Sequence, residues 1–175
     1  MKAIKQIALA AIMGATLAAS LPALAEAPAK NWNAPSHKIY AQVLSDEIMA
    51  NHPELISVTF HGVPPGMSKV YTMFAGSYPD RIGNPDDPDD VMIIETGITI
   101  LDPRWHRTKD AIRKFVPMLP LRDANGENIG LLVLAYKNPM NPGYSDMHFL
   151  QQASALRDAL QWKIPSYAAL FEKAK

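Results

Sequence analysis

Apolar positions recur at helical spacing in two separate parts of the chain. In residues 36–51 they fall on one face, with Ser36 placed as an N-cap and Pro53 following the last residue of the pattern. The same spacing returns from Ser145 or Asp146 to about Lys163. These patterns predict one amphipathic helix near each end of a domain.

Between the two predicted helices, shorter segments alternate apolar and polar residues or are apolar throughout, as β-strands do. Asn125-Gly126 separates the last two of them and is a strong hairpin signal, while Pro64-Pro65-Gly66 separates the first two. The predicted strands are residues 55–62, 69–75, 91–100 (broken at Gly97), 115–121 and 129–136.

The resulting order is helix, hairpin, variable middle, strand, hairpin and helix. Each strand needs cover on one face, so we expect an α+β domain with a five-stranded antiparallel sheet and helices packed on it. Residues 76–90 contain three prolines, two glycines and five aspartates, which predicts a loop or lid. A short helix is expected after Pro103.

The first 25 residues have the pattern of an export signal. Lys2 and Lys5 precede an uncharged, largely apolar run, and Ala23-Leu24-Ala25 forms an A-x-A cleavage site. We expect cleavage after Ala25. A retained membrane anchor is the alternative, although the run is short, rich in alanine and interrupted by polar and helix-breaking residues.

Cleavage would leave residues 26–35 as a flexible tether and residues 36–175 as a single domain. An exported chain without cysteine suits a bacterial periplasm. The whole sequence has 175 residues, with 17 basic residues balancing 17 acidic ones. This composition excludes disulfide miniproteins and cysteine-ligated zinc modules, and export and balanced charge argue against nucleic acid as a partner.

Residues 115–134 carry the most specific pattern in the chain. Asp123 and Gly126 form a D-x-x-G turn after a strand that ends in proline and an apolar residue, and Gly130 lies in the I-G strand that follows. This hairpin resembles the closing hairpin of PAS-like extracytoplasmic sensors of the Cache type. Ile82-Gly83 resembles the lid-side loop of that family more loosely, and the resemblance covers roughly residues 36–140.

The resemblance implies a PAS-like sheet and a small-molecule ligand. Sensors of this type are usually built into membrane receptors, with a transmembrane helix after the sensor domain. Here the chain ends at Lys175, shortly after an amphipathic helix. We therefore expect an exported ligand-binding or sensing domain without its own transmembrane output, which could deliver its signal to a membrane receptor. The resemblance leaves open a homodimer formed through the first helix.

We expect the ligand, an organic carboxylate in the simplest case, between the sheet and residues 78–114. Arg104 or Arg81 would pair with anionic oxygens, while Trp105 and Tyr71 would supply apolar contact. The predicted ligand-binding residues are Tyr71, Met73, Tyr78, Arg81, Arg104, Trp105, His106 and Tyr136.

Two other functions compete with this interpretation. An interaction module would dock onto a membrane sensor or envelope complex and would expose apolar residues on the helix around residues 149–160. Metal or haem binding would use His61, His106 or Met147-His148.

The five histidines show no paired spacing for one metal, and the aspartates of residues 86–90 lack the spacing of a calcium loop. We therefore expect no cofactor and no metal. No nucleophile motif is present either, so we expect a protein that is not an enzyme.

Overall fold

A computed structural model describes residues 29–103, 111–138 and 143–175. The predicted signal peptide, most of the predicted short helix after Pro103, and three predicted ligand residues (Arg104, Trp105 and His106) lie outside these ranges. In chain order the elements are α1 (Tyr40–Asn51), β1 (Leu55–Gly62), β2 (Thr72–Gly76), the 3-10 helix η1 (Pro79–Arg81), α2 (Pro88–Thr96), β3 (Ile100–Leu101), β4 (Lys114–Phe115), β5 (Pro117–Arg122), β6 (Asn128–Lys137), α4 (Asp146–Gln161) and the 3-10 helix η2 (Ala168–Phe171).

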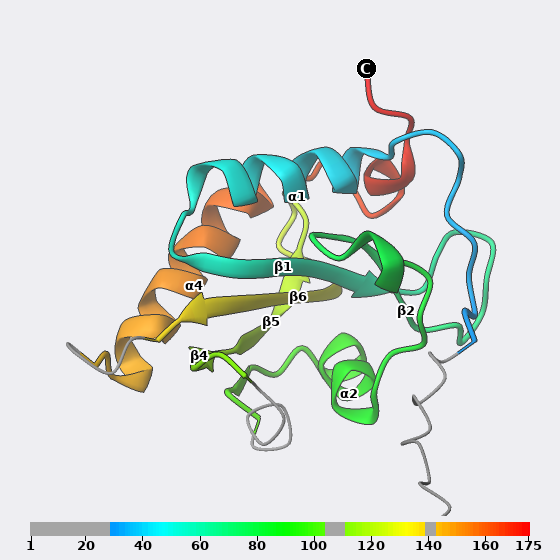
Figure 1. Cartoon of the computed structure of the whole chain (residues 1–175). Coiled ribbons are helices and arrows are strands. Elements are labelled where there is room, and N and C mark those ends of the chain that lie inside the picture. Colours follow the sequence, from blue (N-terminus) through cyan, green and yellow to red (C-terminus); the bar gives the residue numbers. More distant parts are fainter. Residues whose placement is uncertain (1–28, 104–110, 139–142) are drawn as a thin grey trace, which may run out of the picture.

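The strands form one antiparallel sheet in the order β2-β1-β6-β5-β3, with β4 also paired to β6 (Figure 1). β4 and β5 are separated by Val116 alone and both pair with β6, so they act as one interrupted strand. Counted in this way the sheet has five strands. The predicted fold class, an α+β domain with a PAS-like antiparallel sheet and helices at both ends, is confirmed.

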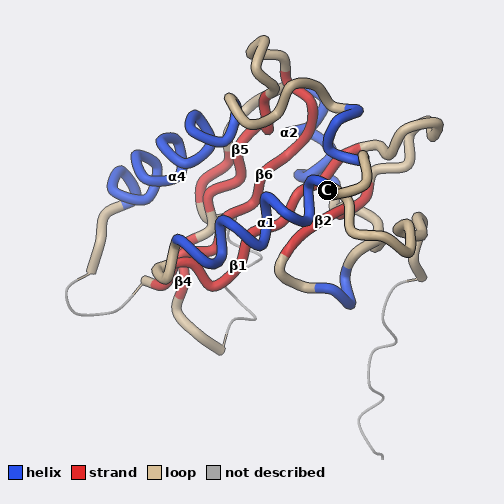
Figure 2. The backbone as a smooth tube through the Cα atoms, turned by 90° about the horizontal axis from the view of Figure 1, so that it is seen from above, coloured by secondary structure: helices blue, strands red, loops and turns tan. Residues whose placement is uncertain are grey.

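Two layers of helix cover the sheet. α1 and α4 pack on one face and α2 packs on the other, as Figures 1 and 2 show. β6 supplies both cores because successive side chains point to opposite faces. Leu132, Leu134 and Tyr136 belong to the α1/α4 core, whereas Leu131 and Ala135 pack against Ile93 of α2.

The two terminal helices begin for different reasons, α4 at a local cap and α1 at a contact with the C-terminal segment. In α4 the Ser145 Oγ accepts a hydrogen bond from the backbone N–H of His148, so Ser145 is the N-cap, one of the two predicted candidates. α1 begins at Tyr40, four residues after the predicted cap Ser36. Ile39, directly before it, is extended: it forms a bridge with Lys173, and the Tyr40 N–H donates to the carbonyl of Glu172.

The prediction of a strand over residues 91–100 is wrong. Most of this segment belongs to α2, and only Ile100 and Leu101 form a strand. Asp87 and Asp90 make a capping box around Pro88 at the helix start, which places the N-terminus inside the segment predicted as a loop. Gly97 ends the helix in the left-handed conformation, with φ of 70°.

The second strand is also shorter than predicted. It begins at Thr72 instead of Lys69, which has a φ of 57° that no strand adopts. Within the described ranges, no helix combines the length and the hydropathy needed to cross a bilayer.

Candidate functional site

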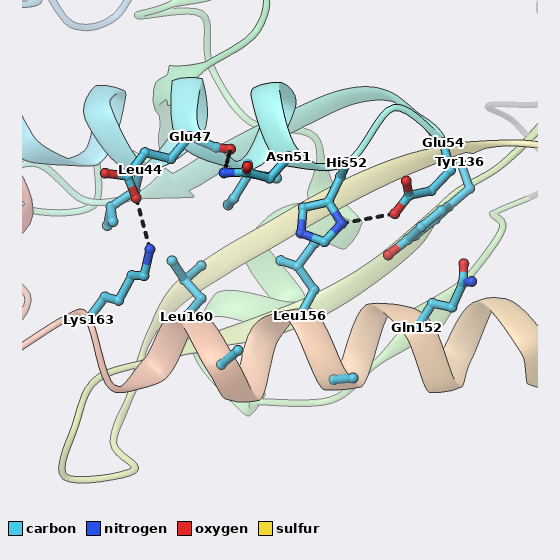
Figure 3. Close-up of a pocket in the computed structure, with 13 residues that line it drawn as sticks. Leu44, Glu47, Asn51, His52, Glu54, Tyr136, Gln152, Leu156, Leu160 and Lys163 are labelled. Atoms are coloured by element: carbon cyan, nitrogen blue, oxygen red, sulfur yellow. Dashed lines mark hydrogen bonds and ion pairs between the residues drawn. The ribbon is translucent and has the colours of Figure 1, made fainter.

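A groove lies between α1 and α4 on their shared face of the sheet, with a cavity of about 440 Å³ (Figure 3). We call it the α1–α4 groove. Its lining is apolar toward the sheet and polar at the rim. The apolar lining consists of Leu44, Ile48, Tyr136, Ala155, Leu156, Ala159 and Leu160, and the polar lining consists of Glu47, Asn51, His52, Glu54, Gln152 and Lys163.

Ion pairs occupy two parts of this rim. Lys163, the second residue after the end of α4, has its Nζ 2.8 Å from Glu47 Oε2 and so joins this end of α4 to α1. His52 Nδ1 lies 2.9 Å from Glu54 Oε1, in the turn between α1 and β1. All four side chains are partly exposed, and exposed ion pairs of this kind contribute only about 0–1 kcal/mol. A ligand with polar groups can therefore exchange with them at low cost.

Tyr136 places a hydroxyl beside this rim. Its ring is buried and packs against Phe149, with centroids 5.6 Å apart, while Figure 3 shows the hydroxyl directed into the groove. Burial, together with the nearby Glu54 carboxylate, raises the pKa of Tyr136. The phenol thus stays protonated at neutral pH and offers a neutral hydrogen-bond donor and acceptor above an apolar floor.

The predicted ligand site does not form on one sheet face. Tyr136 belongs to the α1/α4 core, whereas Met73 is paired with His61 on the face that α2 covers. A bulge between Phe60 and His61 shifts the register of the first hairpin. Alternation along the sequence therefore does not show which side chains of β2 share a sheet face with those of the other strands. Of the five predicted ligand residues that the structure describes, only Tyr136 lines the groove.

The other described members of that set have partners elsewhere. The Tyr71 hydroxyl donates to Glu95 Oε1 of α2 at 2.5 Å, and the Arg81 guanidinium lies 4.8 Å from the Tyr78 ring centroid. The face on which we expected a loop-covered pocket instead carries Ile93 of α2, fully buried against the sheet. α2 fills this layer because its apolar residues follow a helix cap within the segment that was predicted as a loop.

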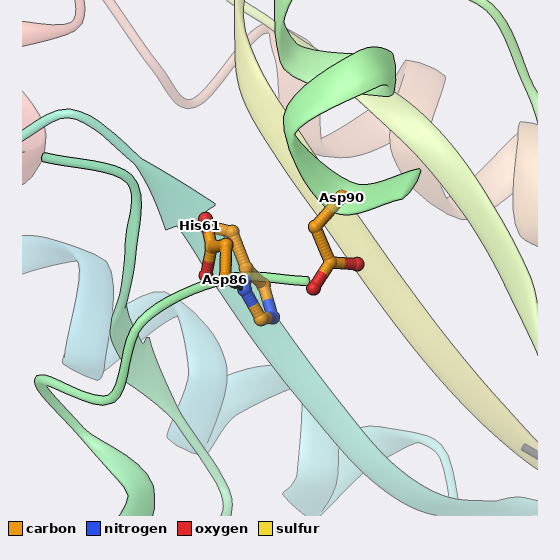
Figure 4. A group of neighbouring side chains, drawn as sticks. All are labelled: His61, Asp86 and Asp90. Carbon is orange, nitrogen blue, oxygen red and sulfur yellow. Dashed lines mark hydrogen bonds and ion pairs between the residues drawn. The ribbon is translucent and has the colours of Figure 1, made fainter. Parts of the chain in front are cut away.

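Beneath α2 lies a second group of polar side chains, the histidine–aspartate cluster of His61, Asp86 and Asp90 (Figure 4). His61 comes from β1, Asp86 precedes α2, and Asp90 lies in its first turn. One potential metal-ligand atom from each side chain lies within 4.8 Å of the other two. The histidine and the aspartates lie in separate segments of the sequence, and the fold brings them together.

Hydrogen bonds fix the orientation of the His61 ring. Nδ1 lies 2.7 Å from Asp86 Oδ1, and Nε2 lies 2.7 Å from Thr59 Oγ1. Burial opposes a charge on the ring, but the Asp86 carboxylate and its hydrogen bond outweigh this effect, and the pKa of His61 is raised. Burial also raises the pKa of Asp90, to about 6, with a further contribution from Asp86.

A hydroxyl, an imidazole and a carboxylate in this order also form the hydrogen-bonded chain of a nucleophilic triad. Thr59, however, is only 7% exposed and lies within a central strand beneath α2. A substrate would have to displace that helix to reach it. The arrangement therefore supports a buried polar network better than a catalytic one.

The groove residues were missed for a simple reason. Glu47 and Asn51 are four residues apart, as are Ala155 and Ala159, so each pair borders the apolar stripe of its helix. This spacing identifies the edges of a groove only when it is known that both helices pack on the same face of the sheet. The side chain of His61 did carry a signal, because Ser57, Thr59 and His61 make a polar face on β1 that the structure buries.

The apolar residues expected to be exposed around 149–160 are mostly buried. Phe149, Leu156 and Leu160 all pack into the core. Large exposed apolar side chains instead flank this segment, at Met147 and at Trp162, which is 74% exposed.

No known protein family matches the chain, and no curated protein matches it either. Among solved structures, it is similar to type II free methionine-R-sulfoxide reductase from Thermoplasma acidophilum, at 13% identity and a TM-score of 0.49, covering 74% of this chain and 90% of the other.

Two further similarities are weaker. The E. coli DcuS sensor domain matches at 14% identity and a TM-score of 0.38, covering 67% of this chain and 71% of that one. A double mutant of the PobR inducer-binding domain from Acinetobacter, in complex with 3-hydroxybenzoic acid, matches at 15% identity and a TM-score of 0.37. This match covers 71% of this chain and 97% of that one. None of the three reaches a TM-score of 0.5, so function has to be argued from the residues of this chain.

Proposed function

We propose that this chain is an exported, non-enzymatic domain that binds a small organic molecule in the α1–α4 groove. The observation that carries the proposal is the cavity of about 440 Å³, with an apolar floor and a charged rim. Small-molecule sites generally measure about 300–1,000 Å³ and combine mostly apolar walls with a few polar groups that orient the ligand. The PAS-like sheet and the resemblance to Cache-type sensors support the same function.

The groove favours a ligand with an apolar body and a neutral or cationic polar group. Its lining carries two carboxylates, Glu47 and Glu54, but only one permanent cation, Lys163. A ligand carboxylate would meet two like charges and one cation that already pairs with Glu47, whereas an amine would meet one like charge and two carboxylates. We therefore propose an amphipathic amine or neutral molecule, in place of the carboxylate expected from the sequence.

Phenethylamine and 3-phenylpropionate, which share an aromatic body and differ in charge, test this choice. Ligand-observed NMR should show saturation transfer from the protein to the amine and a weaker effect for the acid. Preferential binding of 3-phenylpropionate would contradict the proposed ligand class while leaving the groove itself as the site.

Filling the groove should remove its ligand. Ala159 is exposed on α4 and lines the groove, so Ala159→Trp adds a large ring there without disturbing the core. We expect native mass spectrometry of the mature protein to show a stoichiometric organic molecule in the wild type and none in Ala159→Trp. Gln151→Trp, on an exposed part of α4 outside the groove lining, is the matched control and should retain the molecule. Retention by both variants would place the ligand elsewhere.

The export proposal makes a separate prediction. Protein recovered from the periplasmic fraction should have the intact mass of a chain that begins at Glu26, because a signal peptidase cleaves after the A-x-A sequence. A full-length mass in the membrane fraction would instead establish a retained anchor.

Docking onto a membrane sensor remains a second candidate function, and exposed Trp162 supports it. A photo-crosslinking residue at position 162 should capture a membrane sensor in cells if this candidate is correct. Capture of no such partner would leave ligand binding as the function to pursue.

A further inference from the structure

We propose that His61, Asp86 and Asp90 form a binding site for a divalent first-row metal ion, with Zn²⁺ as the best match. The inference is independent of the α1–α4 groove, which lies on the other face of the sheet. The three candidate ligand atoms lie within 4.8 Å of one another. A zinc ion bonded at about 2.0–2.2 Å holds its ligands roughly 3–4 Å apart, so small side-chain rotations suffice to close the site.

A separate observation, at the Asp86 carboxylate, supports a cation at this position. Asp86 has a side chain only 1% exposed, yet its Oδ2 has no hydrogen-bond partner among the described residues. A buried carboxylate oxygen without a partner is costly, and natural proteins usually satisfy such an atom with a donor, a water or an ion. A cation between Asp86 and His61 would satisfy it.

The neighbouring hydrogen bonds leave suitable atoms available. If the Nε2–H of His61 donates to Thr59 Oγ1, at 2.7 Å, the Nδ1 lone pair is directed toward Asp86 and can bind a metal. Thr59 then acts as the outer partner that fixes the ring, as is common for metal-bound histidines. Asp90 Oδ2 accepts from the backbone N–H of Asp87 at 3.2 Å, which leaves the other oxygen of Asp90 for the ion.

The donor set selects the class of metal. An imidazole nitrogen favours Zn²⁺ and its transition-metal neighbours over Ca²⁺ and Mg²⁺, which prefer oxygen ligands alone. Two carboxylates and a neutral imidazole also balance the charge of a divalent ion. Since Asp86 and Asp90 flank the start of α2 and His61 lies on β1, the ion would tie this helix to the sheet.

The test uses the mature protein after chelator treatment, with Zn²⁺ alone as the added ligand. Isothermal titration calorimetry should give one ion per chain, and Asp86→Asn and Asp90→Asn should each weaken binding by tenfold or more, since even outer partners of metal ligands contribute about 10–100-fold. Asp87→Asn is the matched control, because asparagine retains the helix cap while removing an adjacent charge. It should leave the affinity nearly unchanged.

Failure of one-to-one binding, or equal affinity in Asp86→Asn, Asp90→Asn and wild type, would overturn the proposal. A second measurement needs no variant that could misfold. Addition of Zn²⁺ to wild-type protein should shift the ring ¹⁵N resonances of His61, assigned with His61→Gln. A response confined to the other four histidines would equally overturn the site.

Discussion

In chelator at pH 8, Asp90→Asn is expected to raise the free energy of unfolding. The carboxylate is ionised at this pH, but burial has raised its pKa from 3.8 to about 6. A change of this size corresponds to at most about 3 kcal/mol of preference for the neutral form, and we expect a gain of about 1–3 kcal/mol. Asparagine is neutral at every pH and can still accept the hydrogen bond from Asp87.

The same reasoning gives an unusual pH dependence for the metal-free wild type. An acid whose pKa is raised by folding binds more protons in the folded state, so stability falls as pH rises from about 4 to about 7. His61 acts in the same direction, because folding raises its pKa. The stability that this gives is fully present below about pH 6.5, the pKa of an unfolded histidine, and is lost as the pH rises through the pKa of the folded protein. The charged groups acting on Asp90 are His61, Asp86 and Asp89.

Urea unfolding between pH 5 and pH 8 in EDTA checks both statements. The wild type should be more stable at pH 5, and Asp90→Asn should show a flatter profile. Asp87→Asn provides the control for removal of a nearby charge. A wild type that is most stable at pH 8, or an Asp90→Asn variant that is less stable there, would contradict the electrostatic account of the cluster.

A buried carboxylate that lowers stability is a local inconsistency of the kind that folded proteins tolerate at functional sites. Zinc would reverse the effect, since an ion that binds only the folded state stabilises it by mass action. With Zn²⁺ present, the wild type should therefore become the more stable of the two proteins. A reversal of the stability order on addition of Zn²⁺ would indicate a metal site, whereas an unchanged order would indicate a structural hydrogen-bond network.

The parts of the fold that could be predicted from sequence are those specified by nearby residues. β1 spans Leu55–Gly62, as its alternation predicted, and the Asn125-Gly126 turn joins β5 to β6. α4 begins after Ser145 because an N-cap and an apolar stripe coincide there. Each of these signals lies within a few residues of the structure that it specifies.

The parts that were missed depend on distant contacts or on competing local signals. Prolines and aspartates in residues 76–90 are typical of loops, and here some of them cap α2. The facing of Met73 relative to Tyr136 depends on a bulge that the sequence does not reveal. The histidine–aspartate cluster and the α1–α4 groove each combine segments that only the folded chain brings together.

Phe149→Ala is expected to cause the largest loss of stability among the variants considered, about 3–5 kcal/mol, since a large buried ring is replaced by a cavity. Phe149 is 1% exposed and holds the first turn of α4 against the sheet. Its ring stacks on Phe115, with centroids 4.7 Å apart, and also packs against Tyr136.

Because α4 forms one wall of the α1–α4 groove, the same variant should also lose the ligand seen by native mass spectrometry. Met147→Ala is the matched control, because Met147 lies in the same turn and is 58% exposed. It should change stability by less than about 0.5 kcal/mol and retain the ligand. If Phe149→Ala unfolded at nearly the same urea concentration as Met147→Ala, the helix would not depend on this ring. Ligand retained in a destabilised but folded Phe149→Ala protein would argue that the wall formed by α4 is not needed for binding.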